Sequence, residues 1–321
     1  MRNVLDQLDR RRPYRVFDRP IFILSAPRSG SSYLFELLSQ CDNLWHWHAE
    51  LDAIWWDHFP YQRSNTPSDY IAAEEYSPEM ANRVRRDHFR YARWGREERG
   101  QRCGVRDKLG LRRVRLLDKT IANCFHLEIL EQIFPDAFYL FLVRDPRATI
   151  SSMMEGWRKT DAFSKPQLQP WIDAAQSTVD YWSYPAPPGW LEVVGQPLEE
   201  ICAWSWRQHV EAVEKHLPSV PAERQLLVRY EALIDTPQTV VEQIAARCQL
   251  TITPAVETFI ASRPHSRTTV SPPERDKWTQ LNREAIDRIM PQLELPMQRL
   301  GYASSPSTMM NDVESTSSGG P

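Results

Sequence analysis

The hydrophobic and polar positions along the chain form short apolar runs that alternate with longer amphipathic stretches. Three runs consist almost entirely of apolar residues: 21–24 (IFIL), 138–143 (FYLFLV) and 225–230 (QLLVRY). Apolar runs of this length, bounded by turn residues, predict strands, and the first two predict strands that are buried on both faces, as in a parallel sheet. A further segment, 113–117 (RVRLL), alternates between basic and apolar residues and predicts a strand that ends at Asp118 and Lys119.

The stretches between these strands carry the 3.6-residue period of amphipathic helices. After the first strand, one face of the predicted helix carries Tyr33, Leu34, Leu37, Leu38 and Cys41. Further helices are predicted over 66–100, over 123–134, from about Ala148, over 201–217 and over 239–250. Because strands and helices alternate throughout, the pattern predicts an α/β fold in which a central parallel sheet is flanked by helices.

Changes in composition divide the chain into three parts. Residues 1–19 form a polar lead-in, residues 20–303 a single domain, and residues 304–321 a tail with the composition of a disordered segment. Within the domain, residues 161–200 hold six prolines and show no helical period. Long irregular segments are usually binding loops or covers, so this one is predicted to be an insertion that covers a ligand site.

The overall composition narrows the classes of function. The chain has 321 residues, of which 41% are apolar, and a net charge of -3, so no global field draws it to nucleic acid or to an acidic membrane. Five cysteines are scattered without CxxC spacing, which predicts reduced thiols and no zinc cluster. The N-terminus is too charged for a signal peptide, and no stretch approaches the roughly 18 apolar residues of a membrane span. We therefore expect a cytoplasmic protein without a membrane span.

The segment ILSAPRSGSSYLFELLSQ (23–40) joins the first predicted strand to the first helix. A turn that leads into a helix N-terminus binds anions, because free backbone N–H groups and the helix dipole point at the ligand. Gly30 allows a close backbone approach, and Arg28 offers a fork of N–H donors. The standard phosphate-binding loop has a glycine where Ser25 stands and a lysine where Ser31 stands, so a magnesium-triphosphate site is disfavoured. A strand–helix turn with serine caps and no ligand is the alternative.

The end of a second predicted strand favours an anion site. In FLVRDPRATISS (141–152), Arg144 stands at the carboxyl end of the strand and Ser152 follows eight residues later. Ligands of doubly wound sheets lie outside the carboxyl ends of the strands, so Arg28 and Arg144 are expected to reach one elongated, multiply charged ligand. The alternative for Arg144 and Asp145 is a local ion pair at a helix start.

These two segments carry a resemblance to a known family. APRSGSSYL (26–34) and LVRDPRATISS (142–152) resemble the two nucleotide-binding motifs of sulfotransferases that use 3′-phosphoadenosine 5′-phosphosulfate, PAPS. Four more segments resemble further blocks of the same family and follow its usual order: LLDKTIAN (116–123), VRYEALIDTPQTVVEQIA (228–245), KWTQL (277–281) and MQRLGY (297–302). The resemblance implies a P-loop-NTPase-like sulfotransferase fold with helical insertions. It also implies transfer of a sulfuryl group from PAPS, as cosubstrate and without a metal, to a hydroxyl group of a small molecule, sugar or lipid-like metabolite.

The resemblance assigns roles to individual residues. The 5′-phosphosulfate would be held by Arg28, Ser29, Gly30, Ser31 and Ser32, and the 3′-phosphate by Arg144 and Ser152. Tyr33 matches a position that stacks on adenine, and Tyr230 matches one near the adenine edge. The family closes a basic loop on the 3′-phosphate at the place of residues 266–278. The usual Arg-Lys-Gly is absent there, and Arg267 and Lys277 are the candidates.

Sulfuryl transfer needs a base for the acceptor proton and cations for the charge on the leaving oxygen. Lys119 matches a family lysine that contacts the sulfate, with a surface lysine at a strand end as the alternative, and Arg28 adds a second cation. Cytosolic small-molecule members carry a histidine two residues after this lysine, where this chain has Ile121. Other branches use a glutamate beyond the phosphosulfate loop, which corresponds to Glu50 in WHWHAELD (45–52). We expect Glu50 to be the base, with His48 as an alternative base or orienting partner.

Other functions remain open on the sequence alone. A nucleotide-dependent small-molecule kinase would require ATP and magnesium, which the missing loop lysine disfavours. A non-catalytic nucleotide-binding protein would keep the loop without turnover. A zinc site at His46, His48 and Glu50 would need these residues on one face of an extended segment, and nothing else supports it. The sequence does not identify the acceptor or the oligomeric state.

Overall fold

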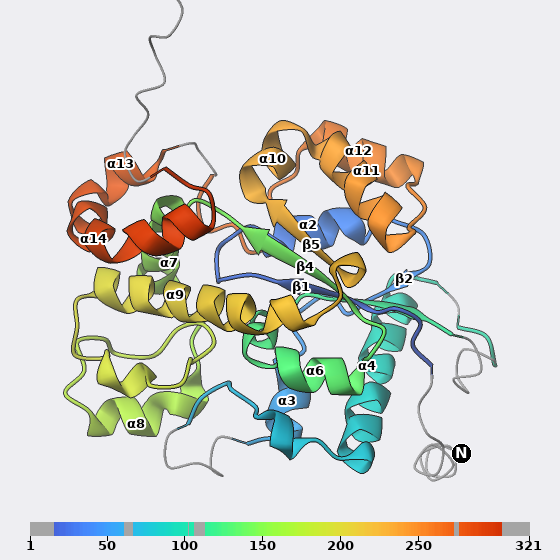
Figure 1. Cartoon of the computed structure of the whole chain (residues 1–321), viewed down its shortest axis with the longest axis horizontal. Coiled ribbons are helices and arrows are strands. Elements are labelled where there is room, and N and C mark those ends of the chain that lie inside the picture. The colour runs from blue at the N-terminus through green and yellow to red at the C-terminus, as the bar shows by residue number, and fades with distance from the viewer. Residues whose placement is uncertain (1–15, 61–66, 102, 106–112, 273–275, 304–321) are drawn as a thin grey trace, which may run out of the picture.

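A computed structural model describes residues 16–60, 67–101, 103–105, 113–272 and 276–303. Within this part of the chain, five strands form one parallel sheet in the order β2-β3-β1-β4-β5. The strands are β1 (Ile21–Leu24), β2 (Leu44–Trp45), β3 (Arg115–Asp118), β4 (Phe138–Val143) and β5 (Gln225–Arg229). Helices cover both faces of the sheet (Figure 1), so the predicted α/β fold is confirmed.

The sheet separates two hydrophobic cores, and the alternation of side chains along β1 supplies both. Ile21 and Ile23 belong to one core, while Phe22 and Leu24 belong to the other. The first core is closed by α2 (Ser31–Leu38), α11 (Pro237–Cys248) and α12 (Pro254–Ser262). The second is closed by α4 (Pro78–Glu98), α6 (Leu127–Ile133), α7 (Pro146–Lys159) and α9 (Leu198–His216). A strand that is fully buried on both faces requires the unbroken apolar run seen in the sequence.

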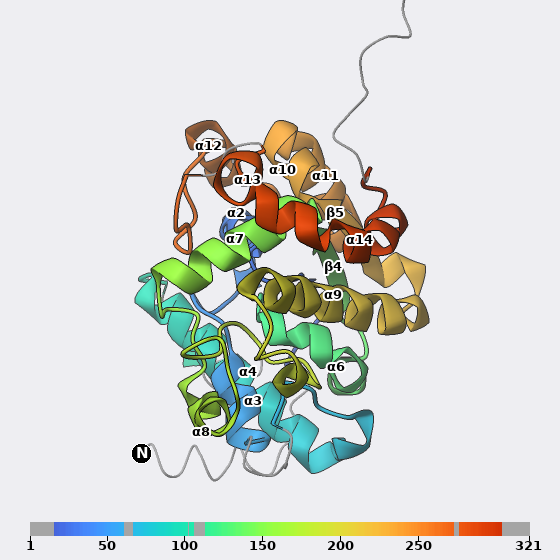
Figure 2. The same ribbon diagram turned by 90° about the vertical axis from the view of Figure 1, so that its left-hand side faces the viewer.

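The remaining helical elements extend these layers. α7, α9 and α14 (Arg283–Arg299) pack on one another at one end of the molecule (Figure 2). The other helices are α3 (Asp52–His58), α8 (Gln169–Ala174), α10 (Tyr230–Asp235) and α13 (Trp278–Leu281). Short 3-10 helices span Ala73–Glu75, Ile121–Phe125, Pro166–Leu168, Trp190–Glu192, Leu217–Ser219 and Ala222–Arg224.

Most predicted elements lie where the apolar pattern placed them, and the differences have local causes. The strands at 21–24 and 138–143 are confirmed to the residue. The helix predicted over 123–134 is interrupted at His126, where a 3-10 turn ends and α6 begins. The long charged helix begins only at Pro78, because Pro78 stands at its first turn and the side chain of Ser77 caps it.

The segment 161–200 is more regular than predicted. It contains α8 and two 3-10 turns, and the indoles of Trp182 and Trp190 are fully buried in the core. Two of its six prolines, Pro166 and Pro170, stand in the first turns of the Pro166–Leu168 and α8 helices, where a missing N–H costs nothing. The core also reaches back to Val16 and Phe17, within the stretch predicted to be a polar lead-in. Residues 1–15 of that lead-in and the tail at 304–321 lie outside the described residues.

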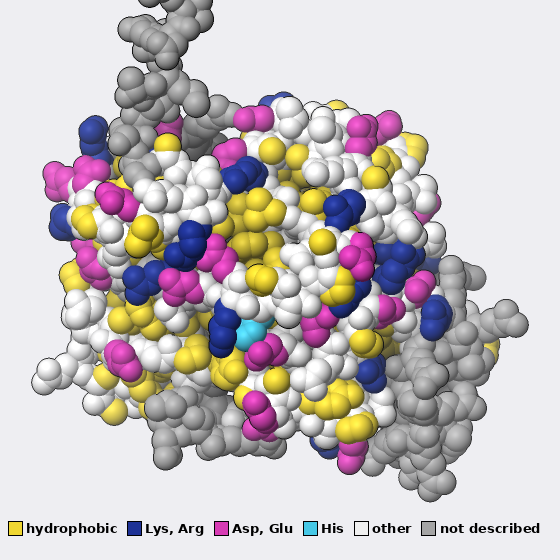
Figure 3. Space-filling model, in the orientation of Figure 1, with side chains coloured by type: hydrophobic (Ala, Val, Ile, Leu, Met, Phe, Trp, Pro, Cys, Tyr) yellow, Lys and Arg dark blue, Asp and Glu magenta, His cyan; other side chains and the backbone are white. Residues whose placement is uncertain are grey.

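The distribution of charged side chains on the surface agrees with the modest net charge of -3. On the face shown in Figure 3, basic and acidic side chains are interspersed rather than gathered into a field of one sign. Among the described residues, none of the helices combines the length and apolar character that crossing a membrane requires.

Candidate active site

The candidate site lies at the carboxyl ends of β1 and β4, the two neighbouring strands at the centre of the sheet. From β1 the chain moves outward to β2 and returns through β3, and it then crosses over to β4 and β5 on the other side. Such a reversal of strand order opens a crevice outside the carboxyl ends of the strands. A cavity of about 270 Å³ occupies this place.

The loop between β1 and α2 forms one wall of the cavity and depends on two left-handed residues. Arg28 has φ 64° and Gly30 has φ 96°, and Gly30 is also the N-cap of α2. A Cβ atom added to Gly30 would overlap the ring of Tyr230. Glycine is therefore required here for its backbone conformation and for its small size. The loop residues Gly30, Ser31 and Ser32 line the cavity, whereas Ser29 is buried beneath it.

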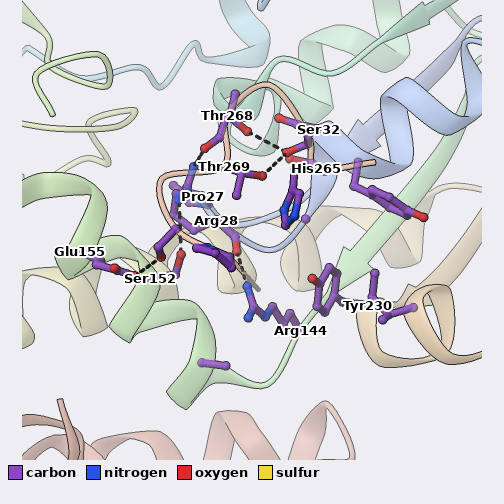
Figure 4. A pocket seen from close by; sticks show the side chains of 18 of the residues that line it. Pro27, Arg28, Ser32, Arg144, Ser152, Glu155, Tyr230, His265, Thr268 and Thr269 are labelled. Atoms are coloured by element: carbon purple, nitrogen blue, oxygen red, sulfur yellow. Dashed lines mark hydrogen bonds between the residues drawn. The ribbon is translucent and has the colours of Figure 1, made fainter. Parts of the chain in front are cut away.

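The side chain of Arg28 crosses the cavity wall (Figure 4). Its Nη1 donates to the Thr268 carbonyl oxygen at 2.7 Å, and its Nε donates to Ser152 Oγ at 3.4 Å. The guanidinium carbon lies 4.9 Å from the centre of the Phe163 ring. Burial lowers the pKa of the Arg28 guanidinium, with the nearby Arg144 acting in the same direction. An anion that enters the cavity would relieve this cost of burial.

Arg144 meets the same loop from β4. Its Nη1 donates to the Arg28 carbonyl oxygen at 3.1 Å, and its guanidinium lies 4.5 Å from the centre of the Tyr230 ring (Figure 4). The ion pair with Asp145 that the sequence left open is not formed, because Asp145 caps α7 and pairs with Arg147 at 2.6 Å. The structure thus brings Arg28, Arg144 and Ser152 together at one part of the cavity wall.

Glu50 and Lys119 meet at another part of the cavity wall. Lys119 Nζ lies 2.7 Å from Glu50 Oε1, and the Ile121 backbone N–H donates to Oε2 at 3.3 Å. The Lys119 side chain is 8% exposed and that of Glu50 is 31% exposed, so the pair is shielded but reachable from the cavity. A carboxylate and an ammonium group therefore lie side by side at the cavity wall.

A polar network holds the Glu50 segment on the sheet. The Leu51 backbone N–H donates to Thr120 Oγ1 at 2.8 Å, and the Thr120 hydroxyl donates to Asp118 Oδ1 at 3.0 Å. Asn123 Nδ2 donates to Asp118 Oδ2 at 2.7 Å. Burial raises the pKa of Asp118 to about 6 despite these hydrogen bonds. The strand end that carries Lys119 therefore also positions Glu50.

The structure does not bring His48 to the cavity. Its Nδ1 lies 3.1 Å from Glu98 Oε2, and its side chain is 43% exposed on the outer side of the segment. His46 is buried on the Phe35 ring, and burial together with Arg99 lowers its pKa to about 4. Among the described residues, no group of three His, Cys, Asp or Glu side chains could hold a metal ion, so the zinc alternative gains no support.

The remaining candidates are divided between the cavity and the surface. Tyr33, Tyr230 and Lys277 line the cavity. The side chain of Arg267 is 59% exposed, pairs with Glu36 at 3.5 Å and donates to the His48 carbonyl oxygen at 2.9 Å. Arg267 is therefore not brought to the cavity wall in this arrangement.

Several lining residues were missed by the sequence analysis, notably Glu155, Phe163, Tyr184 and Arg263. Glu155 could have been found, because it follows Ser152 by three residues and such residues share one face of a helix. The Tyr184 hydroxyl donates to the Met153 carbonyl oxygen at 3.0 Å, a contact between distant segments that no local pattern indicates.

Comparisons with known proteins agree with this geometry. A family model described as the sulfotransferase family matches residues 20–254. No curated protein matches the chain. A sulfotransferase domain from the curacin biosynthetic pathway is 18% identical, covers 89% of this chain and 99% of its own, and has a TM-score of 0.50, which shows a shared fold. A Mycobacterium avium sulfotransferase is 17% identical, with 94% of this chain and 81% of its own covered and a TM-score of 0.49. A mouse sulfotransferase complexed with PAP is 15% identical, with 86% of this chain and 74% of its own covered and a TM-score of 0.39.

Proposed function

Because this chain belongs to the sulfotransferase family, we propose that it transfers the sulfuryl group of PAPS to a hydroxyl group of a small molecule, sugar or lipid-like acceptor. One observation carries the proposal: the loop after β1, the end of β4 with Ser152, and the Glu50–Lys119 pair all line one cavity. A donor with phosphate at two ends and a transferable group needs these three features in one place.

The donor would lie across the carboxyl ends of β1 and β4. The backbone N–H groups at the start of α2, together with Arg28 and Ser32, would hold the 5′-phosphosulfate, since a helix N-terminus favours an anion. Arg144 and Ser152 would bind the 3′-phosphate. Tyr33 and Tyr230 line the same cavity and would contact adenine.

The reaction is an in-line displacement at sulfur. The acceptor oxygen forms a bond to sulfur while the bond from sulfur to the bridging 5′-phosphate oxygen breaks, and 3′-phosphoadenosine 5′-phosphate, PAP, leaves. Glu50 would take the acceptor proton, and Lys119 and Arg28 would stabilise the charge that develops on the leaving oxygen. Arrival of the sulfuryl group would draw Lys119 toward it and loosen its contact with Glu50 Oε1, which frees that oxygen for the proton.

The segment 161–200 would form the acceptor side of the site. Its Phe163 and Tyr184 line the cavity next to α7. The Lys165 ammonium pairs with Asp52 at 2.8 Å and so ties the segment to the helix that follows Glu50. We propose that residues 20–303 act as one domain with this segment as the cover of the acceptor.

The test is transfer of labelled sulfate from PAPS to a panel of hydroxylated metabolites, with product identified by mass spectrometry. Sulfation of at least one acceptor, at a rate that falls strongly in Glu50→Gln, is the expected result. Tight binding of PAP without transfer to any hydroxyl compound would favour a non-catalytic nucleotide-binding protein. Phosphate transfer from ATP in the same assay would favour a kinase.

A further inference from the structure

The cavity contains a second carboxylate, which the proposed reaction does not use. Glu155 on α7 lines the cavity, and its side chain is 11% exposed. Ser271 Oγ donates to its Oε2 at 2.8 Å, and Lys277 Nζ lies 3.3 Å from the same oxygen. Lys159 pairs with Oε1 from the next turn of α7.

The position of Glu155 relates it to the proposed 3′-phosphate site. It follows Ser152 by three residues on α7, which places the two Cβ atoms about 5–6 Å apart. Ser152 contacts the guanidinium of Arg28, and Glu155 is close enough to act on the pKa of Arg28. Of the two candidates for the basic loop, Arg267 and Lys277, only Lys277 lines the cavity, and its ammonium pairs with Glu155. Figure 4 shows the Glu155 carboxylate beside Ser152.

We propose that Glu155 is a specificity-determining residue that weakens the hold on the 3′-phosphate, because it neutralises Lys277 and repels the phosphate from one turn away. The inference rests on the proposed function, since it needs a donor with a 3′-phosphate. Its consequence is faster release of PAP after each turnover. A nucleotide without a 3′-phosphate would not sense Glu155.

The carboxylate keeps its charge under working conditions. Burial would raise the pKa of Glu155, but the contacts with Lys159, Ser271 and Lys277 outweigh burial and hold the pKa below its ordinary value. Protonation therefore does not relieve the repulsion at neutral pH. The bound phosphate and the carboxylate instead share the lysines, and each weakens the hold of the other.

The experiment compares the affinities of Glu155→Gln and the unchanged protein for PAP and for ADP by calorimetry. Glutamine keeps the shape and the bond to Ser271 and removes the charge. We expect PAP to bind about three- to tenfold more tightly, because like-charge contacts are costly in a partly buried site, while ADP affinity stays the same. The dissociation rate of PAP should fall by a similar factor in stopped-flow displacement.

Glu199→Gln is the matched control. The Glu199 side chain is also 11% exposed and pairs with Arg288 at 2.6 Å, outside the cavity. Glu199→Gln should change the affinity for neither PAP nor ADP. Unchanged or weaker PAP binding in Glu155→Gln, or an equal change for PAP and ADP, overturns the proposal and leaves Glu155 as a structural partner of Ser271 and Lys277.

Lys277→Gln is a second variant, which tests the same inference even if Glu155→Gln does not fold. Lys277→Gln leaves Glu155 charged without this partner, so PAP should bind at least about tenfold more weakly, equivalent to about 1.4 kcal/mol, while ADP is unaffected. An equal loss for both nucleotides overturns the inference. If the unchanged protein itself does not prefer PAP to ADP, the proposed donor is wrong, which is a separate outcome.

Discussion

Replacing Glu50 by Gln tests the centre of the proposed mechanism. Glutamine keeps the size of the side chain and one oxygen that can accept from Lys119, but its NH2 group replaces the oxygen that accepts from the Ile121 N–H, and it does not accept the acceptor proton. We expect kcat to fall by roughly 10²–10⁴-fold, the usual contribution of a general base, which corresponds to about 2.7–5.4 kcal/mol of transition-state stabilisation.

The same change costs some stability, and its size follows from the structure. Lys119 is 8% exposed, so its ammonium loses a charged partner at 2.7 Å. Complete removal of one partner from a buried pair costs about 3–5 kcal/mol. Glu50 is 31% exposed and Gln still accepts a hydrogen bond, so we expect about 1–2 kcal/mol and a melting temperature lower by a few degrees. Such a protein stays folded at assay temperature, and the loss of kcat is then chemical.

The assay measures initial rates of sulfation and, by calorimetry, the Kd for PAP. This Kd should change less than about threefold in Glu50→Gln, because Glu50 is assigned no contact with the nucleotide. Glu131→Gln is the matched control: Glu131 pairs with Arg224 at 2.6 Å and is 23% exposed, away from the cavity. His48→Ala should also keep kcat, since its imidazole faces Glu98. Near-normal kcat in Glu50→Gln, with an inactive His48→Ala, would refute the assignment of the base.

Four further predictions concern the donor, the metal, the loop and the buried histidines. PAP should bind far more tightly than ADP, and Arg144→Ala should cost about 1.5–3 kcal/mol of PAP binding, as charge-assisted contacts do; equal affinities by calorimetry would contradict the donor assignment. Turnover should persist in EDTA, and restoration of a lost activity by magnesium would favour a kinase. Gly30→Ala should weaken PAP binding at least about tenfold, because its Cβ overlaps Tyr230 and its φ is left-handed; unchanged binding would mean that the loop is more adaptable than the structure indicates. The urea midpoint of unfolding should fall as the pH is lowered from 6.5 to 4, because burial lowers the pKa of His46, His88, His126 and His209 to about 3–4, and the unfolded chain then binds more protons than the folded one. The raised pKa of Asp118 opposes this loss of stability, and a midpoint that does not change with pH would contradict the prediction.

The sequence predicted those parts of the molecule that depend on local pattern. β1 and β4 are apolar on both faces and were found to the residue, and the strand-end positions of Arg28, Arg144 and Lys119 followed from the strands. β2 was missed because two residues, Leu44 and Trp45, are too short to show a period.

The composition of the cavity wall was harder to predict, because it depends on contacts between distant segments. Glu50 and His48 are two positions apart and equivalent in an alternating pattern, and contacts with distant segments, among them the hydrogen bond from Leu51 to Thr120, accompany the placing of Glu50 rather than His48 beside Lys119. The prolines of 161–200 indicated an irregular segment, yet Trp182 and Trp190 bury it against the rest of the chain. Burial against partners far away in the sequence leaves no periodic signal.

The hydrogen bond from Arg28 to the Thr268 carbonyl oxygen joins residues 240 positions apart. A ribosome synthesising this chain releases the loop between β1 and α2 long before the other half of that bond. The sheet strands up to β4 can assemble long before Thr268 and Lys277 emerge, so a nascent chain passes through a stage with a formed β1–β4 pair and an incomplete nucleotide site. Ligand can therefore stabilise the complete site only after Thr268 and Lys277 have emerged, and nascent chains stalled before residue 278 should gain less protection from proteolysis by PAP than longer chains do.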